Sequence, residues 1–583
     1  MKVLLVALDS KYIHANLAVR YLKEFCNEFN IHIKEFTINQ KVEYILGEII
    51  AEKADLICFS CYIWNIEYIN TISYILKEGK NKAKILYGGP EVSFEIKKTM
   101  EANSFIDYII FGEGEVTFKE FLRELSKPVP DLFQVKGLAF RHEGLININE
   151  SRELIDNLDI INYPYDGEDD FSNKIIYYES SRGCPFNCSF CMSSIDKKMR
   201  VFSMERVKRD LKALLGTKAR QIKFVDRTFN ADYKRAMEIM EFIVKNNKNN
   251  MTIHFEITVD IINDEFLDFL GRMPVNMFQF EVGVQSLNEK TLSEINRRMD
   301  RERLYNAIKR IKSYQNIHLH LDLIAGLPYE DYKTFKSSFE GVYKLGAEKI
   351  QLGFLKVLKG TKIYQDKEKH GIKYRQSAPY EVICTNYITL EDLLKLKDIE
   401  ELVEKYYNEK YFHKSLSYVI NKYFLHSAFE FFSSFSQYWK KNDLYKKSHS
   451  RKKLYEIFYD YMECSYKIDD EFISSLKYDY IYNNQFEELP DYLNKESEEK
   501  FRLLKRHLAN DQEFKNKFFP TIEDKIINEF RIAEIGQNVI LFIYRDKDNI
   551  FNKCHTHCIN ELARNYLKEE SIIRKELKDE KKK

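Results

Sequence analysis

The sequence of 583 residues lacks an excess of charge of either sign, because 91 basic side chains stand against 90 acidic ones. Without a global field, nothing indicates a nucleic-acid or membrane-surface protein. It also lacks any run of roughly 18 apolar residues, so no membrane-spanning helix is expected. The N-terminus has no small-residue cleavage site, and its short apolar run predicts a first strand instead of a signal peptide. We therefore expect a cytoplasmic protein.

A disulfide framework is absent as well, since the ten cysteines are spread over a long chain. Three of them, Cys184, Cys188 and Cys191, lie within eight residues of one another. In a reducing compartment such a group indicates a metal site or a catalytic thiol. A second group, Cys554-His-Thr-His-Cys558, fits neither a standard zinc finger nor a ferredoxin-like loop, and we interpret it as incidental.

Strand and helix patterns alternate from the start of the chain. Strand-like apolar runs cover residues 3–8, 31–38, 55–60, 84–89 and 107–112, and a hairpin is expected within 136–149. The alternation predicts a doubly wound parallel sheet, a Rossmann-like domain over residues 1–149. Its ligands would bind at the carboxyl ends of the strands.

A second alternating series follows an acidic linker at residues 150–172. Its strand-like runs cover residues 174–181, 221–226, 251–258, 277–284, 317–324 and 349–355. Six strands with long helical spacers predict a (β/α)6 partial TIM barrel over residues 173–375, with its functional loops at the strands' carboxyl ends. From residue 376 to 583 the alternation stops, and we expect a mainly helical region with one late strand at 538–544.

The cysteine triad has the spacing Cys-x3-Cys-x2-Cys and follows the first predicted barrel strand. Three thiolates can bind three irons of a 4Fe–4S cluster and leave the fourth iron open to an exogenous ligand. Phe190, between the second and third cysteines, would shield the cluster from water. Zinc is the alternative, but a structural zinc site takes a fourth protein ligand and none lies nearby. The spacing favours the cluster.

With this triad on the first strand of a barrel, residues 174–375 resemble the radical S-adenosylmethionine (radical SAM) superfamily. In that family the open iron binds S-adenosylmethionine, and an electron delivered through the cluster cleaves it to a 5′-deoxyadenosyl radical. The resemblance also implies a reductant such as flavodoxin or ferredoxin. Carried over by position, the residues implied to contact S-adenosylmethionine are Glu256, Glu281, Gln285, Ser286 and Lys359.

A further motif, VDRTFN at residues 225–230, places Asp226 and Asn230 at the predicted barrel mouth. A capping role and a catalytic role are both open for these two side chains.

Two glycine turns, GGPEVS at 88–93 and FGEGE at 111–115, follow the fourth and fifth strands of the first domain. Neither is GxGxxG, so dinucleotide binding has little support, and any doubly wound sheet needs such turns. Directly before a radical triad, however, they resemble the cobalamin-binding subclass of radical SAM proteins. The positions implied to contact cobalamin are Ser10, Tyr12, His14, Ser60, Gly88, Gly89, Glu91, Gly112 and Glu113.

His14 departs from the Asp-x-His-x-x-Gly motif of many cobalamin proteins, because it stands five residues after Asp9. We interpret it as a hydrogen-bonding loop residue in preference to a cobalt ligand.

The C-terminal region resembles a domain of unknown function appended to one branch of cobalamin-type radical enzymes. The leading hypothesis is a radical SAM enzyme that uses cobalamin as a methyl carrier to methylate an unactivated substrate atom. One alternative keeps the radical without methyl transfer, for rearrangement, ring contraction or sulfur insertion. The other is a non-catalytic iron–sulfur or cobalamin sensor, although a sensor needs no open iron. The near-neutral charge selects no substrate class, small-molecule or macromolecular.

Overall fold

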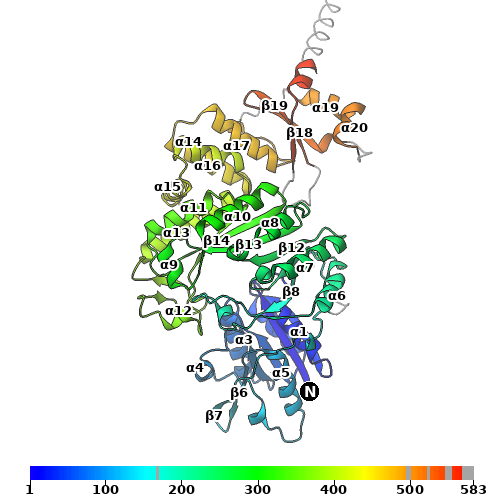
Figure 1. The fold of residues 1–583 in the computed structure, drawn as a ribbon, viewed down its shortest axis with the longest axis vertical. Coiled ribbons are helices and arrows are strands. Elements are labelled where there is room, and N and C mark those ends of the chain that lie inside the picture. Colours follow the sequence, from blue (N-terminus) through cyan, green and yellow to red (C-terminus); the bar gives the residue numbers. More distant parts are fainter. Residues whose placement is uncertain (166–169, 494–500, 521–525, 545–553, 567–583) are drawn as a thin grey trace, which may run out of the picture. The chain divides into compact units, whose positions relative to one another are not determined.

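The computed structural model describes residues 1–165, 170–493, 501–520, 526–544 and 554–566 (Figure 1). The chain divides into two compact units, Met1–Leu393 and Leu394–Lys583. Among the described residues, no helix is long and apolar enough to cross a membrane.

The first unit begins with a seven-stranded sheet of order β2-β1-β3-β4-β5-β6-β7. Its strands are β1 (Lys2–Asp9), β2 (Asn30–Thr37), β3 (Leu56–Ser60), β4 (Lys84–Gly88), β5 (Tyr108–Ile110), β6 (Leu138–His142) and β7 (Leu145–Ile148). The first five are parallel, and the predicted hairpin adds β6 and β7 as antiparallel strands. The order reverses between β1 and β3, which is where doubly wound sheets bind ligands.

Helices cover both faces of this sheet. They are α1 (Leu17–Phe25), α2 (Val42–Ala51), α3 (Ile66–Glu78), α4 (Ile96–Ala102) and α5 (Gly114–Leu125). Alternate residues of β1 enter two separate cores: Leu4 and Val6 pack with residues of α2 and α3, and Val3 and Leu5 pack with residues of α1 and α5. Burial on both sides explains why β1 and β3 are apolar almost throughout.

The central sheet has six parallel strands in the order β15-β14-β13-β12-β11-β8, which confirms the predicted partial barrel. They are β8 (Ile175–Tyr178), β11 (Gln221–Phe224), β12 (Thr252–Ile257), β13 (Phe278–Gln285), β14 (Ile317–Ala325) and β15 (Lys349–Phe354). The accompanying helices are α6 (Met204–Leu215), α7 (Tyr233–Asn246), α8 (Asp264–Leu270), α9 (Glu289–Glu294), α10 (Arg301–Tyr314), α11 (Tyr332–Tyr343) and α12 (Lys362–Gln365) (Figure 1). Short pairs β9 (Ser181–Arg182) with β10 (Arg200–Val201), and β16 (Lys373–Tyr374) with β17 (Val382–Cys384), complete the unit.

The barrel strands alternate between buried apolar and half-buried polar residues. In β14, for example, Leu319, Leu321 and Leu323 are fully buried, whereas His318 and Asp322 on the opposite face are only half-buried. Successive side chains of a strand point to opposite faces, so one face of this sheet packs under helices and the other is polar. The polar face is the inner face of the partial barrel.

The second unit is mainly helical, as expected. Its helices are α14 (His413–Tyr423), α15 (Ala428–Lys441), α16 (Arg451–Ser465), α17 (Asp470–Asn483), α19 (Arg502–Asn510) and α20 (Gln512–Phe518), and α13 (Leu390–Val403) leads into it. It also holds an antiparallel sheet of β18 (Phe530–Ile535), β19 (Asn538–Ile543) and β20 (His555–Cys558), of which only β19 was predicted. The Cys554–Cys558 group thus lies on and beside an edge strand, and HTHC lacks the apolar alternation that would have predicted one.

Candidate functional site

The three cysteines lie on one loop that follows β8. The antiparallel pair β9–β10 closes the base of this loop, and the Cys184 N–H donates to the Asp196 carbonyl at 3.1 Å. Gly183 has φ +86°, and a Cβ there would lie 2.4 Å from the Lys198 carbonyl oxygen. Only glycine therefore lets the loop fold back on itself just before the first cysteine.

Two polar side chains contact the thiols. The Arg297 Nη1 donates to the Cys188 Sγ at 3.7 Å, and the Thr228 Oγ1 lies 3.5 Å from the Cys184 Sγ. Burial raises the pKa of the Cys188 thiol, and the Arg297 guanidinium opposes this because it favours the thiolate. Cys191 is half-buried. Because the thiolate is the form that ligates iron, the loop offers donors that suit an iron–sulfur cluster.

The described residues include no three His, Cys, Asp or Glu side chains gathered around a single ion position. A cubane cluster does not need such convergence, because each thiolate binds a different iron. A structural zinc ion does need it, since its four ligands meet at one atom. The donor set of the loop therefore fits the cluster better than zinc.

Arg297 also joins this loop to β13, because its Nη2 donates to the Gly283 carbonyl. Gln285 has φ 69°, and a Cβ on Gly283 would lie 2.2 Å from its amide nitrogen, so glycine leaves room for this carboxamide to fold back over the strand. The Gln285 Oε1 is buried with no hydrogen-bond partner among the described residues. A buried acceptor without a partner is expected where a ligand supplies the donor.

The inner face of the barrel carries a network of charged side chains on β11, β12 and β13. The Glu281 Oε2 accepts from the His254 Nε2 at 3.0 Å and from the Lys223 Nζ at 3.3 Å. Burial alone would raise the pKa of Glu281, but these two donors hold it well below the usual range. Burial and the charge of Glu281 raise the pKa of Asp322, and burial raises that of Glu256. The donors around Glu281 thus favour its ionised form, whereas burial favours the neutral forms of Asp322 and Glu256.

Ser286, although next to Gln285, is fully buried and directed elsewhere. Its hydroxyl donates to the Glu330 Oε1 at 2.6 Å, and the Ser338 hydroxyl donates to the same oxygen at 3.0 Å. Burial raises the pKa of Glu330 to about 7. The structure therefore uses the Ser286 hydroxyl within the protein, and a contact with S-adenosylmethionine stays a prediction.

Asp226 and Asn230 both bind neighbouring backbone. The Asp226 carboxylate accepts from the Ser180 N–H at 2.8 Å and from the Ser180 and Ser181 hydroxyls at 2.6 Å. The Asn230 amide exchanges two hydrogen bonds with the Thr258 backbone, at 2.8 and 2.9 Å. Both side chains thus hold neighbouring barrel loops together, neither at a helix N-cap, and a catalytic role for them stays a prediction.

The loop after β1 docks on the first barrel strand. The Ile175 N–H donates to the Ile13 carbonyl at 2.7 Å, and the His14 Nδ1 lies 2.8 Å from the Tyr177 hydroxyl. Burial lowers the pKa of His14, so the imidazole is neutral. Tyr12 is exposed, with the Lys174 Nζ 3.9 Å from its ring centroid. This contact covers the free edge of β8, which would otherwise leave its backbone groups unpaired.

The other predicted cobalamin contacts lie at the carboxyl ends of β1, β3, β4 and β5. Ser10 is exposed and Ser60 is buried. Gly89 has φ +116°, and a Cβ there would lie 2.5 Å from the Cys61 carbonyl oxygen. At Gly88 and Gly112, by contrast, an added Cβ would meet no atom closer than 3.9 Å. This edge therefore has open space beside its backbone, as a bound ring system would require.

The turn after β4 contacts the barrel at the exit of β15. The Lys359 Nζ lies 3.4 Å from the Glu91 Oε1 and 3.3 Å from the Tyr380 hydroxyl, and that hydroxyl also donates to Glu91. A Cβ on Gly360 would lie 2.4 Å from the Phe94 ring. Glu91, predicted to contact cobalamin, and Lys359, predicted to contact S-adenosylmethionine, thus lie beside each other.

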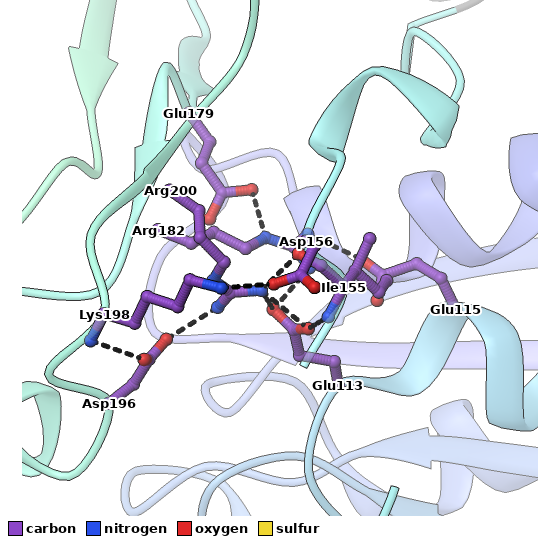
Figure 2. A network of polar contacts seen from close by, with 9 residues as sticks. All are labelled: Glu113, Glu115, Ile155, Asp156, Glu179, Arg182, Asp196, Lys198 and Arg200. Carbon is purple, nitrogen blue, oxygen red and sulfur yellow. Dashed lines mark hydrogen bonds and ion pairs between the residues drawn. The ribbon is translucent and has the colours of Figure 1, made fainter. Parts of the chain in front are cut away.

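The turn after β5 contacts the cysteine loop through buried ion pairs (Figure 2). Arg182 donates to Glu113 at 3.1 Å, to Glu115 at 2.6 Å and to Glu179 at 3.0 Å. Arg200 donates to Glu113 at 3.0 Å. Burial would raise the pKa of Glu113, but hydrogen bonds, chiefly from Arg200, and the charge of Arg182 lower it. The Glu113 side chain, predicted for cobalamin, is engaged with arginines of the barrel.

Sequence reasoning did not find Arg297, Thr228, Arg182 or Arg200. Thr228 lies inside the VDRTFN motif, so its strand-end position was a usable signal. The arginines carried no such signal, because the partners that join them to distant segments stand 14 to 109 residues away.

Family models match three parts of the chain. The B12 binding domain matches residues 3–122, the radical SAM superfamily matches 178–340, and a protein of unknown function (DUF4080) matches 368–573. The matches correspond to the doubly wound domain, the barrel with its cysteine triad and the C-terminal region. The chain thus carries a radical SAM domain, with a B12-binding domain before it and a domain of unknown function after it.

Relatives of known sequence agree with this assignment. An uncharacterized methyltransferase of Pyrococcus horikoshii is 28% identical over 375 residues, which are 62% of this chain and 78% of that protein. The cobalamin-dependent radical SAM methyltransferase TokK of Streptomyces tokunonensis is 23% identical over 309 residues, 50% of this chain and 45% of TokK. The chain therefore spans less than half the length of TokK.

Solved structures share the fold at low identity. The cobalamin-dependent S-adenosylmethionine radical enzyme OxsB, with aqua-cobalamin bound, superposes with a TM-score of 0.58 at 16% identity, over 88% of this chain and 82% of that one. The radical S-adenosylmethionine methyltransferase TsrM from Kitasatospora setae gives 0.55 at 16% identity, over 65% of this chain and 81% of that one.

Proposed function

We propose that this chain cleaves S-adenosylmethionine reductively at a 4Fe–4S cluster held by Cys184, Cys188 and Cys191. We further propose that it uses cobalamin as a methyl carrier to methylate an unactivated substrate atom. One observation carries the proposal: the cysteine loop joins, through Arg297, the strand whose Gln285 offers a buried unpartnered acceptor. The strand-end loops of the B12-binding domain contact the same barrel.

The cluster, when bound, supplies the single electron that breaks a carbon–sulfur bond of S-adenosylmethionine. The chain's own residues would hold the cluster and bind S-adenosylmethionine and the substrate. Arg297 favours the thiolate of Cys188, and the buried thiols are shielded from water, which tunes the potential. Gln285 would accept a hydrogen bond from the amino or hydroxyl groups of the cofactor, and the polar inner face would hold substrate under the mouth.

Cobalamin would lie at the carboxyl ends of β1, β3, β4 and β5, beside Gly88 and Gly112. His14 is held by Tyr177 and by the backbone pairing of its loop, which supports our interpretation that it is a hydrogen-bonding residue and no cobalt ligand. A flavodoxin or ferredoxin would deliver the electron. Such chemistry needs a reducing compartment, which supports a cytoplasmic location.

The first test is the cofactor content of anaerobically reconstituted protein. We expect about four irons and four sulfides per chain, and a bound corrinoid. The variant with Cys184, Cys188 and Cys191 all changed to Ala should lose iron and sulfide. A Cys464→Ala variant is the matched control, because this exposed thiol lies in the second unit and should leave the content unchanged. Full iron and sulfide in the triple variant would contradict the proposal.

The second test follows the methyl group. Methyl-labelled S-adenosylmethionine is incubated anaerobically with reduced protein and a cellular small-molecule or RNA fraction, and products are analysed by mass. Label in a product supports methyl transfer. Consumption of S-adenosylmethionine with unlabelled products would instead indicate rearrangement, ring contraction or sulfur insertion, and no consumption with any reductant would favour the sensor.

A further inference from the structure

Two arginines stand opposite each other at the base of the cysteine loop. In the β9–β10 pair, Arg182 is the direct cross-strand partner of Arg200. Like charges placed directly opposite on neighbouring strands repel each other. Both side chains are nevertheless buried, with 12% and 3% of their surface exposed. The pair therefore depends on carboxylates that surround it.

Four carboxylates supply this neutralisation, two from each domain. Glu179 and Asp196 belong to the barrel, and Asp196 accepts from the Arg200 Nη2 at 2.6 Å. Glu113 and Glu115 belong to the B12-binding domain and come from the turn after β5 (Figure 2). Glu113 is bound by both arginines and also accepts from the Ile155 N–H at 2.7 Å.

These ion pairs have a fixed position relative to both cofactor sites. Arg182 is two residues before Cys184, and Gly183 between them lies so close to the Lys198 carbonyl that a Cβ there would be 2.4 Å from its oxygen. Asp196, which holds Arg200, also accepts the Cys184 N–H through its carbonyl. On the other side, Glu113 directly follows Gly112, where the backbone borders open space. The network therefore links the cysteine loop to the turn that contains Gly112.

We propose that Glu113, Glu115, Arg182 and Arg200 form an arginine–glutamate clamp that couples occupancy of the corrinoid site to occupancy of the cluster site. The four are positioning residues: they act on Cys184 and on the Gly112 turn through the backbone. The clamp rests on the proposed function, since it requires both cofactors to bind. A cluster that orders the cysteine loop fixes the arginines, and the fixed arginines hold the β5 turn in its binding conformation.

Coupling of this kind is reciprocal, because the factor by which the cluster tightens corrinoid binding equals the factor by which the corrinoid stabilises the cluster. Coupling between two binding sites typically changes affinity by about 5- to 150-fold, and about tenfold corresponds to 1.4 kcal/mol. We expect this factor for the full-length protein.

The test measures hydroxocobalamin affinity by absorbance titration under anaerobic conditions. It compares cluster-loaded protein with the triple Cys184→Ala, Cys188→Ala, Cys191→Ala variant, which keeps the clamp but cannot hold a cluster. The cluster-loaded form should bind about tenfold more tightly. Equal affinity would overturn the clamp and leave the proposed function standing, whereas no corrinoid binding in either form would contradict the proposed function itself.

Variants locate the coupling. In Glu115→Gln, the cluster-loaded form should bind hydroxocobalamin at most about twofold more tightly than the cluster-free form. Arg182→Lys should keep part of the difference in affinity. Glu120→Gln is the matched control, because Glu120 is also on α5 but pairs with Arg152, away from the cysteine loop, and it should keep the full factor. The rate at which a chelator bleaches the cluster, with and without corrinoid, gives an independent readout. An unchanged factor in Glu115→Gln would overturn the assignment to these residues.

Discussion

The first unit contains a mixed sheet and a parallel sheet, and their side chains are distributed in opposite ways. In the B12-binding domain, β1 and β3 are buried at nearly every position, because helices cover both faces. In the barrel, β14 alternates strictly between buried and half-buried positions, and β13 does so from Phe280 onward. The first sheet can therefore bind a ligand only at its strand ends, and the second can bind one along its inner face as well.

The comparison also separates two kinds of buried carboxyl in the barrel. Glu281 lies on the inner face, where His254 and Lys223 keep it ionised. Glu330 lies among serines on the helix-covered side, where burial raises its pKa to about 7. Glu281 is thus held as an anion by its two donors, whereas at Glu330 burial favours the neutral acid.

The largest expected effect comes from a charge placed in the doubly covered sheet. Val6→Asp in β1 should destabilise the first unit by more than about 4 kcal/mol, because the carboxylate would be buried without a partner. Gln351→Asp, at an exposed position of barrel strand β15, should change stability by less than about 0.5 kcal/mol. Thermal or denaturant unfolding measures both, and similar losses would remove the distinction between the sheets.

A smaller effect is expected from Glu330, and it depends on pH. The folded protein holds the Glu330 proton with a pKa of about 7, above the ordinary value of 4.5. The folded state therefore binds the proton more tightly, and stability falls by about 3 kcal/mol as pH rises from roughly 4.5 to 7. Glu330→Gln should remove this slope, whereas Glu289→Gln, at an exposed position, should keep it. An identical slope in wild type and Glu330→Gln would contradict the assignment.

The smallest effect distinguishes two neighbours on the inner face. Glu281→Gln takes an anionic acceptor from Lys223 and His254 and should cost about 2 kcal/mol. Asp322→Asn should cost less than about 1 kcal/mol, because burial and the charge of Glu281 raise the pKa of Asp322 and so favour its neutral form, which Asn resembles. Denaturation midpoints at pH 7 compare them. A larger loss for Asp322→Asn would reverse the assignment of charge.

Periodicity in the sequence was enough to predict the strands of both sheets. The apolar run 3–8 corresponds to β1, which is buried on both faces. The alternating run 317–324 corresponds to β14, which is buried on one face only. The two-residue strands β9 and β10 are too short to show a period. In β18 the two-residue hydrophobic period is weak, because Arg531 and Glu534 are among its six residues. These elements were missed for that reason.

The site was predictable only where its signal is local. The three cysteines and the glycine turns are short motifs, so the sequence alone identified them. The contacts of Arg297 with Cys188, and of Arg182 with Glu115, join residues 109 and 67 positions apart. No local pattern encodes such pairs, because the first forms only when the barrel folds and the second only when the two domains pack together.

Formation of 5′-deoxyadenosine tests the central claim most directly. Anaerobically reconstituted protein is reduced in the presence of S-adenosylmethionine, and the nucleoside is quantified by chromatography and mass. We expect 5′-deoxyadenosine from the wild type and from Cys464→Ala, and none from the variant with Cys184, Cys188 and Cys191 changed to Ala. Its absence from wild-type protein that carries a full complement of iron and sulfide, or its persistence in the triple variant, would contradict the account.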